Sequence, residues 1–271
     1  MPTPTLILIH GYPLDHTLWD YVIAPLREVT QVLTPDLPGF GGKPPLATEP
    51  SIDRMADEIA KLFVNEHIDH AVVAGMSMGG YVALSLAERY RHRLAGIALI
   101  STQSTADSEE ARAARLQMIE SVRARGTAAA SEAILKRLFA PVNVSNESFR
   151  QRVVRSAERA GVEGICWALQ AMASRSDRTD ILSELHFPSL VVHGSEDQII
   201  PAERARQMAG CLQDSEYVEI PNAGHAIPWE APEQLVDELI GLLRRAEAAE
   251  PHLEGQLNRP GVVIAPTDNG L

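Results

Sequence analysis

The amino-acid sequence predicts an α/β fold with a mostly parallel, doubly wound sheet and an inserted helical cap. Short runs of β-type residues alternate with helical patterns, as expected where helices connect parallel strands. Several of these runs are apolar at every position, which is typical of strands that are covered on both faces. Between residues 103 and 185 the strand pattern is lost and only helical patterns remain. This interruption predicts that a helical segment is inserted between two strands of the sheet.

The expected elements follow one another along the chain with short connections. Strand-like runs cover residues 5–10, 31–35, 71–76, 94–101, 188–193 and 216–220. Ser51 is suited to cap a helix, because Ile52, Met55 and the apolar residues after them fall on one helical stripe. Pro232 suits the first turn of the last helix, whose pattern decays after Arg245.

The inserted segment contains helical patterns over residues 109–125, 128–139 and 147–173. It falls between the Ser77 motif and Asp197, both described below, so we interpret it as a cap over the sheet rather than as extra core helices. The chain then divides into a core of residues 1–102 and 186–246, a cap of residues 103–185, and a C-terminal tail of residues 247–271. In that tail, the run 261–266 could add a strand to an edge of the sheet.

Composition and charge disfavour several classes of function. The formal net charge is −12, and such acidity disfavours nucleic acids and anionic membrane surfaces as partners. The two cysteines, Cys166 and Cys211, lie in helical patterns and are expected to be reduced thiols rather than a disulfide or a metal site. No targeting segment or membrane-spanning run is recognised, which predicts a cytoplasmic protein. No metal and no organic cofactor are implied.

Residues 75–80, Gly-Met-Ser-Met-Gly-Gly, stand between a strand pattern and a helix pattern. This context is typical of a nucleophile elbow, in which Ser77 occupies a strained turn and glycines avoid collisions around it. The alternative is a dinucleotide-binding loop, because Gly75, Ser77 and Gly80 match its spacing. However, serine replaces the middle glycine, and the next strand pattern ends without the acidic residue that would hold a ribose. We therefore favour Ser77 as a nucleophile.

A serine nucleophile needs a base, and the base needs an acid that orients it. Asp197 follows the strand pattern 188–193, and His225 follows the pattern 216–220, so both should reach the sheet edge where Ser77 lies. The order Ser77, Asp197, His225 is the one found in hydrolases that carry a nucleophile elbow. Asp107 is a weaker candidate for the acid. His10 competes as the base, but we interpret it as a structural residue that bonds the loop backbone.

An oxyanion hole requires two backbone N–H groups directed at the developing negative charge. The amide of Met78 follows the nucleophile at the start of a helix, whose dipole would help. The second amide should come from the loop after the first strand. Tyr12 is the choice there, because Pro13 has no N–H group.

Five motifs in register give the chain a family resemblance. They are His10-Gly11-Tyr12-Pro13-Leu14, Asp36-Leu37-Pro38-Gly39-Phe40-Gly41, the Ser77 motif, Gly194-Ser195-Glu196-Asp197 and Gly224-His225, with Trp19 in addition. Over residues 6–245 the chain resembles α/β-hydrolases, in particular capped esterases, 3-oxoadipate enol-lactonase-like enzymes and cofactor-free haloperoxidase-like enzymes. The resemblance implies that Ser77, Asp197 and His225 form a triad with Tyr12 and Met78 as oxyanion donors.

The expected activity is hydrolysis of carboxylic esters with small to medium acyl chains through an acyl-enzyme. The expected partner is a small-molecule ester or lactone. Lactonase or perhydrolase activity with the same triad is the alternative, and a non-catalytic ligand-binding protein is a more distant one. The sequence does not indicate an oligomeric state.

Several side chains could contact the substrate. Four could line an apolar pocket or pack in the core, namely Trp19, Met118, Trp167 and Trp229. The cap arginines are expected to form a solvated helix face, and these are Arg112, Arg115, Arg123 and Arg125. If one of them faced inward, it would favour a substrate that carries a carboxylate.

Overall fold

The computed structural model describes the backbone of residues 3–257 and the side chains of residues 3–249. Within this part of the chain, six strands form one sheet in the order β2-β1-β3-β4-β5-β6, and every neighbouring pair is parallel. The strands are β1 (Thr5–Ile9), β2 (Val32–Leu33), β3 (Ala71–Met76), β4 (Leu94–Ile100), β5 (Ser189–Gly194) and β6 (Ser215–Ile220). The predicted doubly wound parallel sheet is therefore confirmed, with β2 shorter than expected.

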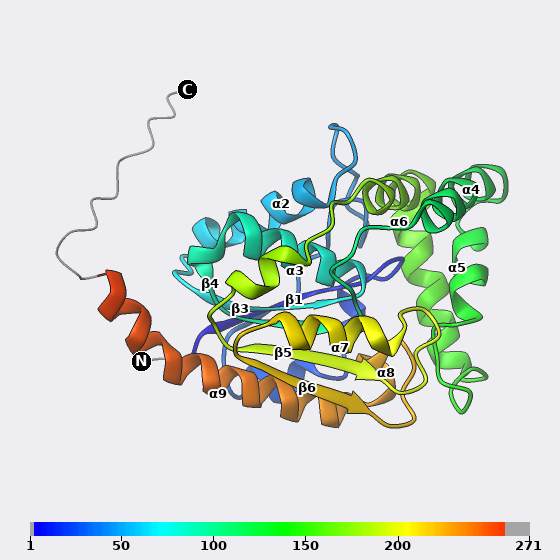
Figure 1. The fold of residues 1–271 in the computed structure, drawn as a ribbon. Coiled ribbons are helices and arrows are strands. Elements are labelled where there is room, and N and C mark those ends of the chain that lie inside the picture. The colour runs from blue at the N-terminus through cyan, green and yellow to red at the C-terminus, as the bar shows by residue number, and fades with distance from the viewer. Residues whose placement is uncertain (1–2, 258–271) are drawn as a thin grey trace.

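Helices cover both faces of this sheet (Figure 1). They are α1 (Ile23–Arg27), α2 (Ile52–Asn65), α3 (Met78–Arg89), α4 (Glu109–Arg125), α5 (Ala128–Leu135), α6 (Glu147–Ala173), α7 (Ala202–Cys211), α8 (Ile227–Glu230) and α9 (Pro232–Leu257). Short 3₁₀ turns cover His16–Trp19, Arg91–Arg93 and Asp180–Glu184. Among the described residues, no helix combines the length and the hydropathy needed to cross a bilayer.

The core has two layers, one on each face of the sheet. Along β4, Ile97 and Leu99 pack with side chains of α2, α3 and α7, whereas Ala98 and Ile100 pack with α1 and α9. Successive strand residues point to opposite faces, so a strand that is covered on both sides must be apolar throughout. This is the physical reason for the unbroken apolar runs in the sequence.

Helices α4, α5 and α6 leave the sheet after β4 and return before β5, beyond the carboxyl ends of the strands (Figure 1). We call these three helices the inserted helices. The two ends of the insertion are bonded to each other, because the Arg178 amide donates to the Ser104 carbonyl at 2.9 Å. The Arg178 guanidinium also bonds Glu88 at 2.9 Å, which fixes the return of the chain to the end of α3.

Two helix ends differ from the prediction. Helix α5 ends at Leu135, whereas the pattern extended to residue 139. Helix α9 continues to Leu257, so the expected tail begins too early at residue 247. The residues 246–250 are only alanine and glutamate, and their high helix propensity favours the continuation up to Pro251. The possible edge strand at 261–266 lies outside the described residues.

Candidate active site

Ser77 lies at the apex of a sharp turn between β3 and α3, with φ 53° and ψ −116°. A positive φ is uncommon for a residue with a side chain and costs about 1–3 kcal/mol, so neighbouring groups must hold it. The Ser77 amide donates to the Ile100 carbonyl at 2.9 Å, and the Thr102 hydroxyl donates to the Ser77 carbonyl at 2.8 Å. Ile100 is the last residue of β4 and Thr102 follows it, so the end of this strand fixes the turn.

The glycines around Ser77 have the role that the sequence predicts. A Cβ atom on Gly75 would collide with the Gly79 carbonyl, and one on Gly79 would collide with the Ile9 carbonyl. A Cβ atom on Gly11 would lie 3.1 Å from the Cβ of Ser77. The loop that follows β1 is therefore packed directly against the turn.

His225 and Asp197 meet at the carboxyl ends of β6 and β5. Nδ1 of His225 lies 2.8 Å from Oδ2 of Asp197, and their side chains are only 2% and 0% exposed. The other carboxylate oxygen, Oδ1, accepts from the amides of Ile199 and Ile200 at 2.8 and 3.0 Å. Burial opposes ionisation of Asp197, but His225 and the two amides outweigh it and lower the pKa of the carboxyl. A charged Asp197 fixes the imidazole with its Nε2 atom free.

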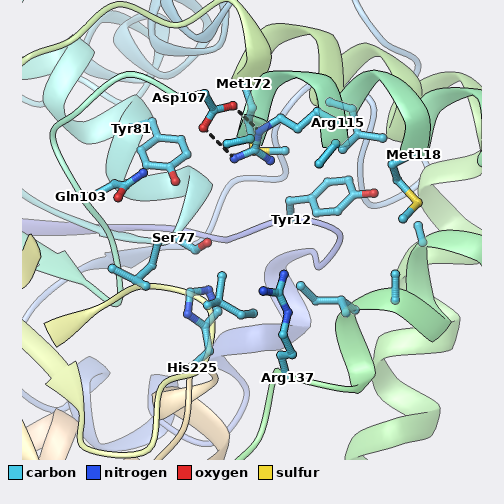
Figure 2. A pocket seen from close by; sticks show the side chains of 18 residues that line it. Tyr12, Ser77, Tyr81, Gln103, Asp107, Arg115, Met118, Arg137, Met172 and His225 are labelled. Atoms are coloured by element: carbon cyan, nitrogen blue, oxygen red, sulfur yellow. Dashed lines mark hydrogen bonds and ion pairs between the residues drawn. The ribbon is translucent and has the colours of Figure 1, made fainter. Parts of the chain in front are cut away.

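A cavity of about 420 Å³ joins this pair to Ser77. Ser77 and His225 both line it (Figure 2), whereas Asp197 is not among its lining residues. No hydrogen bond joins the Ser77 hydroxyl to His225 among the described side chains. Bonds of this kind are often long in unliganded sites and shorten when substrate binds. The volume is within the range of pockets for small molecules.

The two residues that the sequence suggests as oxyanion donors adjoin Ser77, Met78 along the chain and Tyr12 through Gly11. Met78 is the first residue of α3, where amides have no intrahelical acceptor. Tyr12 follows Gly11, which contacts Ser77, and its side chain lines the cavity. Neither amide donates a hydrogen bond to another described residue, so both are available to an oxygen in the cavity.

Glu230 was not identified from the sequence, but it holds the loop that carries His225. Its carboxylate accepts from the Gly224 amide at 3.0 Å and from the Ala140 amide and the Asn143 side chain at 2.8 and 3.0 Å. Burial raises the pKa of this carboxyl, although the hydrogen bonds partly oppose the shift. The inserted segment is thereby bonded to the His225 loop. A glutamate in a short helix gives no sequence signal for such a role.

His10 is a structural residue, as expected. Its Nε2 accepts from the Leu37 amide at 3.0 Å, so Nδ1 carries the proton and donates to the Gly11 carbonyl at 3.0 Å. Burial lowers the pKa of this imidazole. With both nitrogens engaged, His10 is not available as the base.

Of the four residues suggested for substrate contact, Met118 lines the cavity. The three tryptophans do not line it, which corrects the expectation for Trp19, Trp167 and Trp229. Trp19 is fully buried in the core, the Trp167 indole donates to the Thr48 carbonyl, and Trp229 packs against Phe139 and Phe149. Large aromatic side chains remove most apolar area from water in the core, and this preference determines their place here.

Arg115 is also placed differently from the expectation of a solvated face. It lines the cavity and pairs with Asp107, Nε to Oδ2, at 2.5 Å (Figure 2). Asp107 pairs in addition with Arg175 at 2.6 Å, so this carboxylate is engaged by two guanidinium groups and is not the acid partner of His225. The Arg112 guanidinium donates to the Ala173 carbonyl. The two remaining cap arginines, Arg123 and Arg125, form exposed pairs with glutamates.

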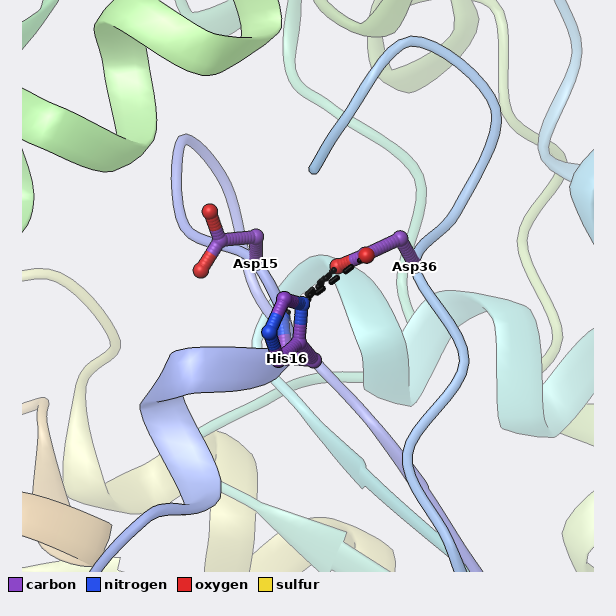
Figure 3. A group of neighbouring side chains, drawn as sticks. All are labelled: Asp15, His16 and Asp36. Atoms are coloured by element: carbon purple, nitrogen blue, oxygen red, sulfur yellow. Dashed lines mark hydrogen bonds and ion pairs between the residues drawn. The ribbon is translucent and has the colours of Figure 1, made fainter. Parts of the chain in front are cut away.

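The grouping of Asp15, His16 and Asp36 has the donor atoms of a possible metal site (Figure 3). Asp36 already accepts from the His16 backbone amide at 2.8 Å and lies 2.9 Å from its imidazole. Asp15 accepts from the Thr17 hydroxyl and pairs with Arg159. These bonds account for the carboxylates as loop-fixing groups, so the cluster gives no support for a bound metal.

Comparison with known proteins shows a family and several relatives. Residues 4–232 match the family described as alpha/beta hydrolase fold. A thermophilic esterase from Thermogutta terrifontis, with malate bound, is 36% identical, has a TM-score of 0.85, and 90% of each chain is covered. The pimeloyl-(acyl-carrier protein) methyl ester esterase of Aromatoleum aromaticum is 28% identical over 89% of this chain and 99% of that protein.

A further relative is the dihydrolipoyllysine-residue acetyltransferase component of the acetoin cleaving system of Pseudomonas putida, which is 28% identical over 89% of this chain. The chain spans only 63% of the length of that protein.

Proposed function

This chain belongs to the alpha/beta hydrolase fold family, and we propose that it is a serine hydrolase that cleaves carboxylic esters of small to medium acyl chain. The observation that carries the proposal is the 2.8 Å contact between His225 and Asp197 at the cavity that Ser77 also lines. Esterase relatives of similar length, at 36% and 28% identity, support the same reaction class.

In the proposed reaction, Nε2 of His225 takes the proton from the Ser77 hydroxyl as its oxygen attacks the ester carbonyl. The amides of Met78 and Tyr12 donate to the oxyanion that forms. When the tetrahedral intermediate collapses, the bond to the alcohol breaks and His225 returns the proton to the leaving oxygen. Water, deprotonated by His225, then attacks the acyl-enzyme and releases the acid. Asp197 stabilises the imidazolium in both steps.

The inserted helices serve as the cap of the proposed core–cap division. Residues of α4, α5 and α6 line the cavity together with Ser77 and His225, so they bound the space for the substrate. A cavity of about 420 Å³ suits short and medium acyl chains better than long ones. The bonds from Glu230 to the Gly224 and Ala140 amides couple the cap to the base loop.

Hydrolysis of p-nitrophenyl acetate and butyrate tests the proposal. We expect the wild type to turn over both, and Ser77→Ala to lower kcat by at least about a thousandfold, because the nucleophile is lost. Asp197→Asn should lower kcat by about a thousandfold or more, since the imidazole loses its orienting charge. A fluorophosphonate probe should add to Ser77 in the wild type, as mass spectrometry of the peptide would show.

Ser121→Ala is the matched control, because Ser121 lies on α4 and its hydroxyl donates only to the Gln117 carbonyl. This variant should keep wild-type activity. Equal rates for the wild type and Ser77→Ala, or labelling of the Ser77→Ala protein by the probe, would contradict the proposed function.

A further inference from the structure

Arg137 is a charged residue of the cavity for which the protein supplies no counter-charge. It follows α5, and its guanidinium points into the space that Ser77 and His225 line (Figure 2). Its backbone amide donates to the Ile134 carbonyl at 3.0 Å. The guanidinium itself has neither an ion pair nor a hydrogen bond with any described side chain or carbonyl. Arg137 is also exposed, so it lies where the cavity opens to solvent.

The other charged groups of the cavity leave Arg137 uncompensated. Apart from His225, the lining contains two guanidinium groups, Arg115 and Arg137, and one carboxylate, Asp107. Asp107 is already paired with Arg115 and with Arg175, which approaches from outside the lining. One positive charge is therefore in excess beside the nucleophile, in a chain whose formal net charge is −12.

Tyr12 also lines this cavity, and its hydroxyl is a second donor without a partner. It is buried and forms no hydrogen bond with the described residues. Figure 2 shows that it points towards Met118 and away from Ser77. Burial raises the pKa of this hydroxyl, so it stays protonated and can only be satisfied by an acceptor. Because this hydroxyl has almost no accessible surface, the exposed guanidinium of Arg137 is the unpaired donor that a ligand in the cavity can reach.

We propose that the esters cleaved here carry a carboxylate besides the scissile ester group, and that Arg137 binds this carboxylate. The inference rests on the proposed function, because it names the substrate class of the same site. A guanidinium matches a carboxylate with two parallel hydrogen bonds, which adds both affinity and orientation.

Two matched substrate pairs test the inference and locate the charge. Comparing mono-p-nitrophenyl adipate with p-nitrophenyl hexanoate tests for a carboxylate on the acyl side of the ester. Comparing 4-carboxyphenyl butyrate with phenyl butyrate tests for a carboxylate on the alcohol side of the ester. After subtraction of the uncatalysed rate, the wild type should favour the charged ester of one pair in kcat/KM by about tenfold to a hundredfold. A preference for the neutral ester in both pairs would overturn the inference.

Variants of Arg137 assign the preference to this residue. Arg137→Gln should remove it, mainly through KM, whereas Arg137→Lys keeps the charge and should retain part of it. Arg137→Glu should favour the neutral ester. Lys136→Gln is the matched control, because Lys136 is adjacent and exposed but does not line the cavity. It removes the same charge and should leave the ratio within about twofold of the wild type.

The two proposals fail in different ways. If neutral esters are hydrolysed in a Ser77-dependent manner but Arg137→Gln keeps the wild-type ratio, only the inference is wrong. If no ester is hydrolysed in a Ser77-dependent manner, the proposed function is wrong and the inference is lost with it. Should Arg137→Gln fold poorly, the ratios of Arg137→Lys and Arg137→Glu decide the question.

Discussion

Tyr12 shows how one residue can serve two purposes through different atoms. Its backbone amide, which follows Gly11 at the Ser77 turn, is a proposed oxyanion donor, while its hydroxyl is buried without a hydrogen-bond partner among the described residues. The amide does not depend on the side chain, so the two contributions can be separated by substitution. An unsatisfied buried donor lowers the stability of the unliganded protein by about 1–3 kcal/mol.

We therefore predict that Tyr12→Phe stabilises the unliganded protein by about 1 kcal/mol, because the unpaired donor is removed and the ring is kept. Urea unfolding, followed by circular dichroism, measures the change in the free energy of unfolding. Tyr21→Phe is the control, since Tyr21 is 42% exposed and should have little effect. A clear loss of stability in Tyr12→Phe would show that the hydroxyl has a partner in solution.

Among the elements, Asp107 connects α4 to the segment that follows α6. It pairs with Arg115 of α4 and with Arg175, and the side chains of Asp107 and Arg175 are each only 2% exposed. Burial opposes the charge of Asp107, but the two guanidinium groups outweigh it and lower the pKa of the carboxyl. Removing one member of a buried ion pair costs about 3–5 kcal/mol, because the remaining charge is left without a partner.

Asp107→Asn should accordingly destabilise the protein by about 3 kcal/mol or more at pH 7. Because the folded pKa of Asp107 is lowered, its contribution is complete above the ordinary value of 3.8 and is lost as the pH falls further. The difference from the wild type should thus shrink from pH 7 to pH 3, as urea unfolding at each pH would show. Glu120→Gln, which alters an exposed pair, should change little, and an unchanged Asp107→Asn difference at pH 3 would refute the argument.

The sequence predicts the elements well where short-range signals mark their ends. Helix α4 begins after Ser108, which accepts from the Ala111 amide, and ends at Gly126 with φ 75°. Both are standard capping residues, so the bounds of α4 are predicted correctly. The end of α9 is predicted wrongly, because the helix continues past Pro251, a residue type that usually ends a helix. Capping chemistry accounts for the bounds of α4, whereas local signals do not account for the end of α9.

The site is predictable only where residues follow strands. Ser77, Asp197 and His225 lie in the loops that follow β3, β5 and β6, and parallel strands bring their carboxyl ends to one edge. Arg115 lies on α4 and Arg137 follows α5, and the placement of this inserted segment depends on contacts between residues far apart in sequence. A signal existed for Arg137, because it continues the stripe of Ala130 and Ile134 that lines the cavity. Helical spacing alone could not show which side of that stripe faces Ser77.

At the scale of the whole molecule, the sheet separates two core layers. Ile97 and Ile100 are fully buried on β4, but they belong to different layers and share no packing partners across the sheet. Ile97→Val and Ile100→Val should each lower the free energy of unfolding by about 0.5–1.5 kcal/mol. The double variant should lower it by the sum of the two, within about 0.5 kcal/mol. Urea unfolding of the four proteins completes the cycle.

Val73 and Ile97 provide the contrasting pair, since they are directly opposite each other on β3 and β4 and share one layer. Combining Val73→Ala with Ile97→Val should depart from additivity by more than the first pair does. If both pairs departed from additivity by the same amount, the two layers would not be energetically independent.

Strands β4 and β5 are hydrogen-bonded neighbours, with Ile97 opposite Ser189, although the inserted helices separate them along the chain. The segment with the inserted helices therefore leaves the sheet and returns to it at adjacent points, where Ser104 and Arg178 are hydrogen-bonded. Evolution can lengthen, shorten or exchange such an inserted segment without shifting the register of any strand. Related proteins could in this way acquire new substrate selectivities by exchange of the inserted helices, while the residues that follow the strands stay the same.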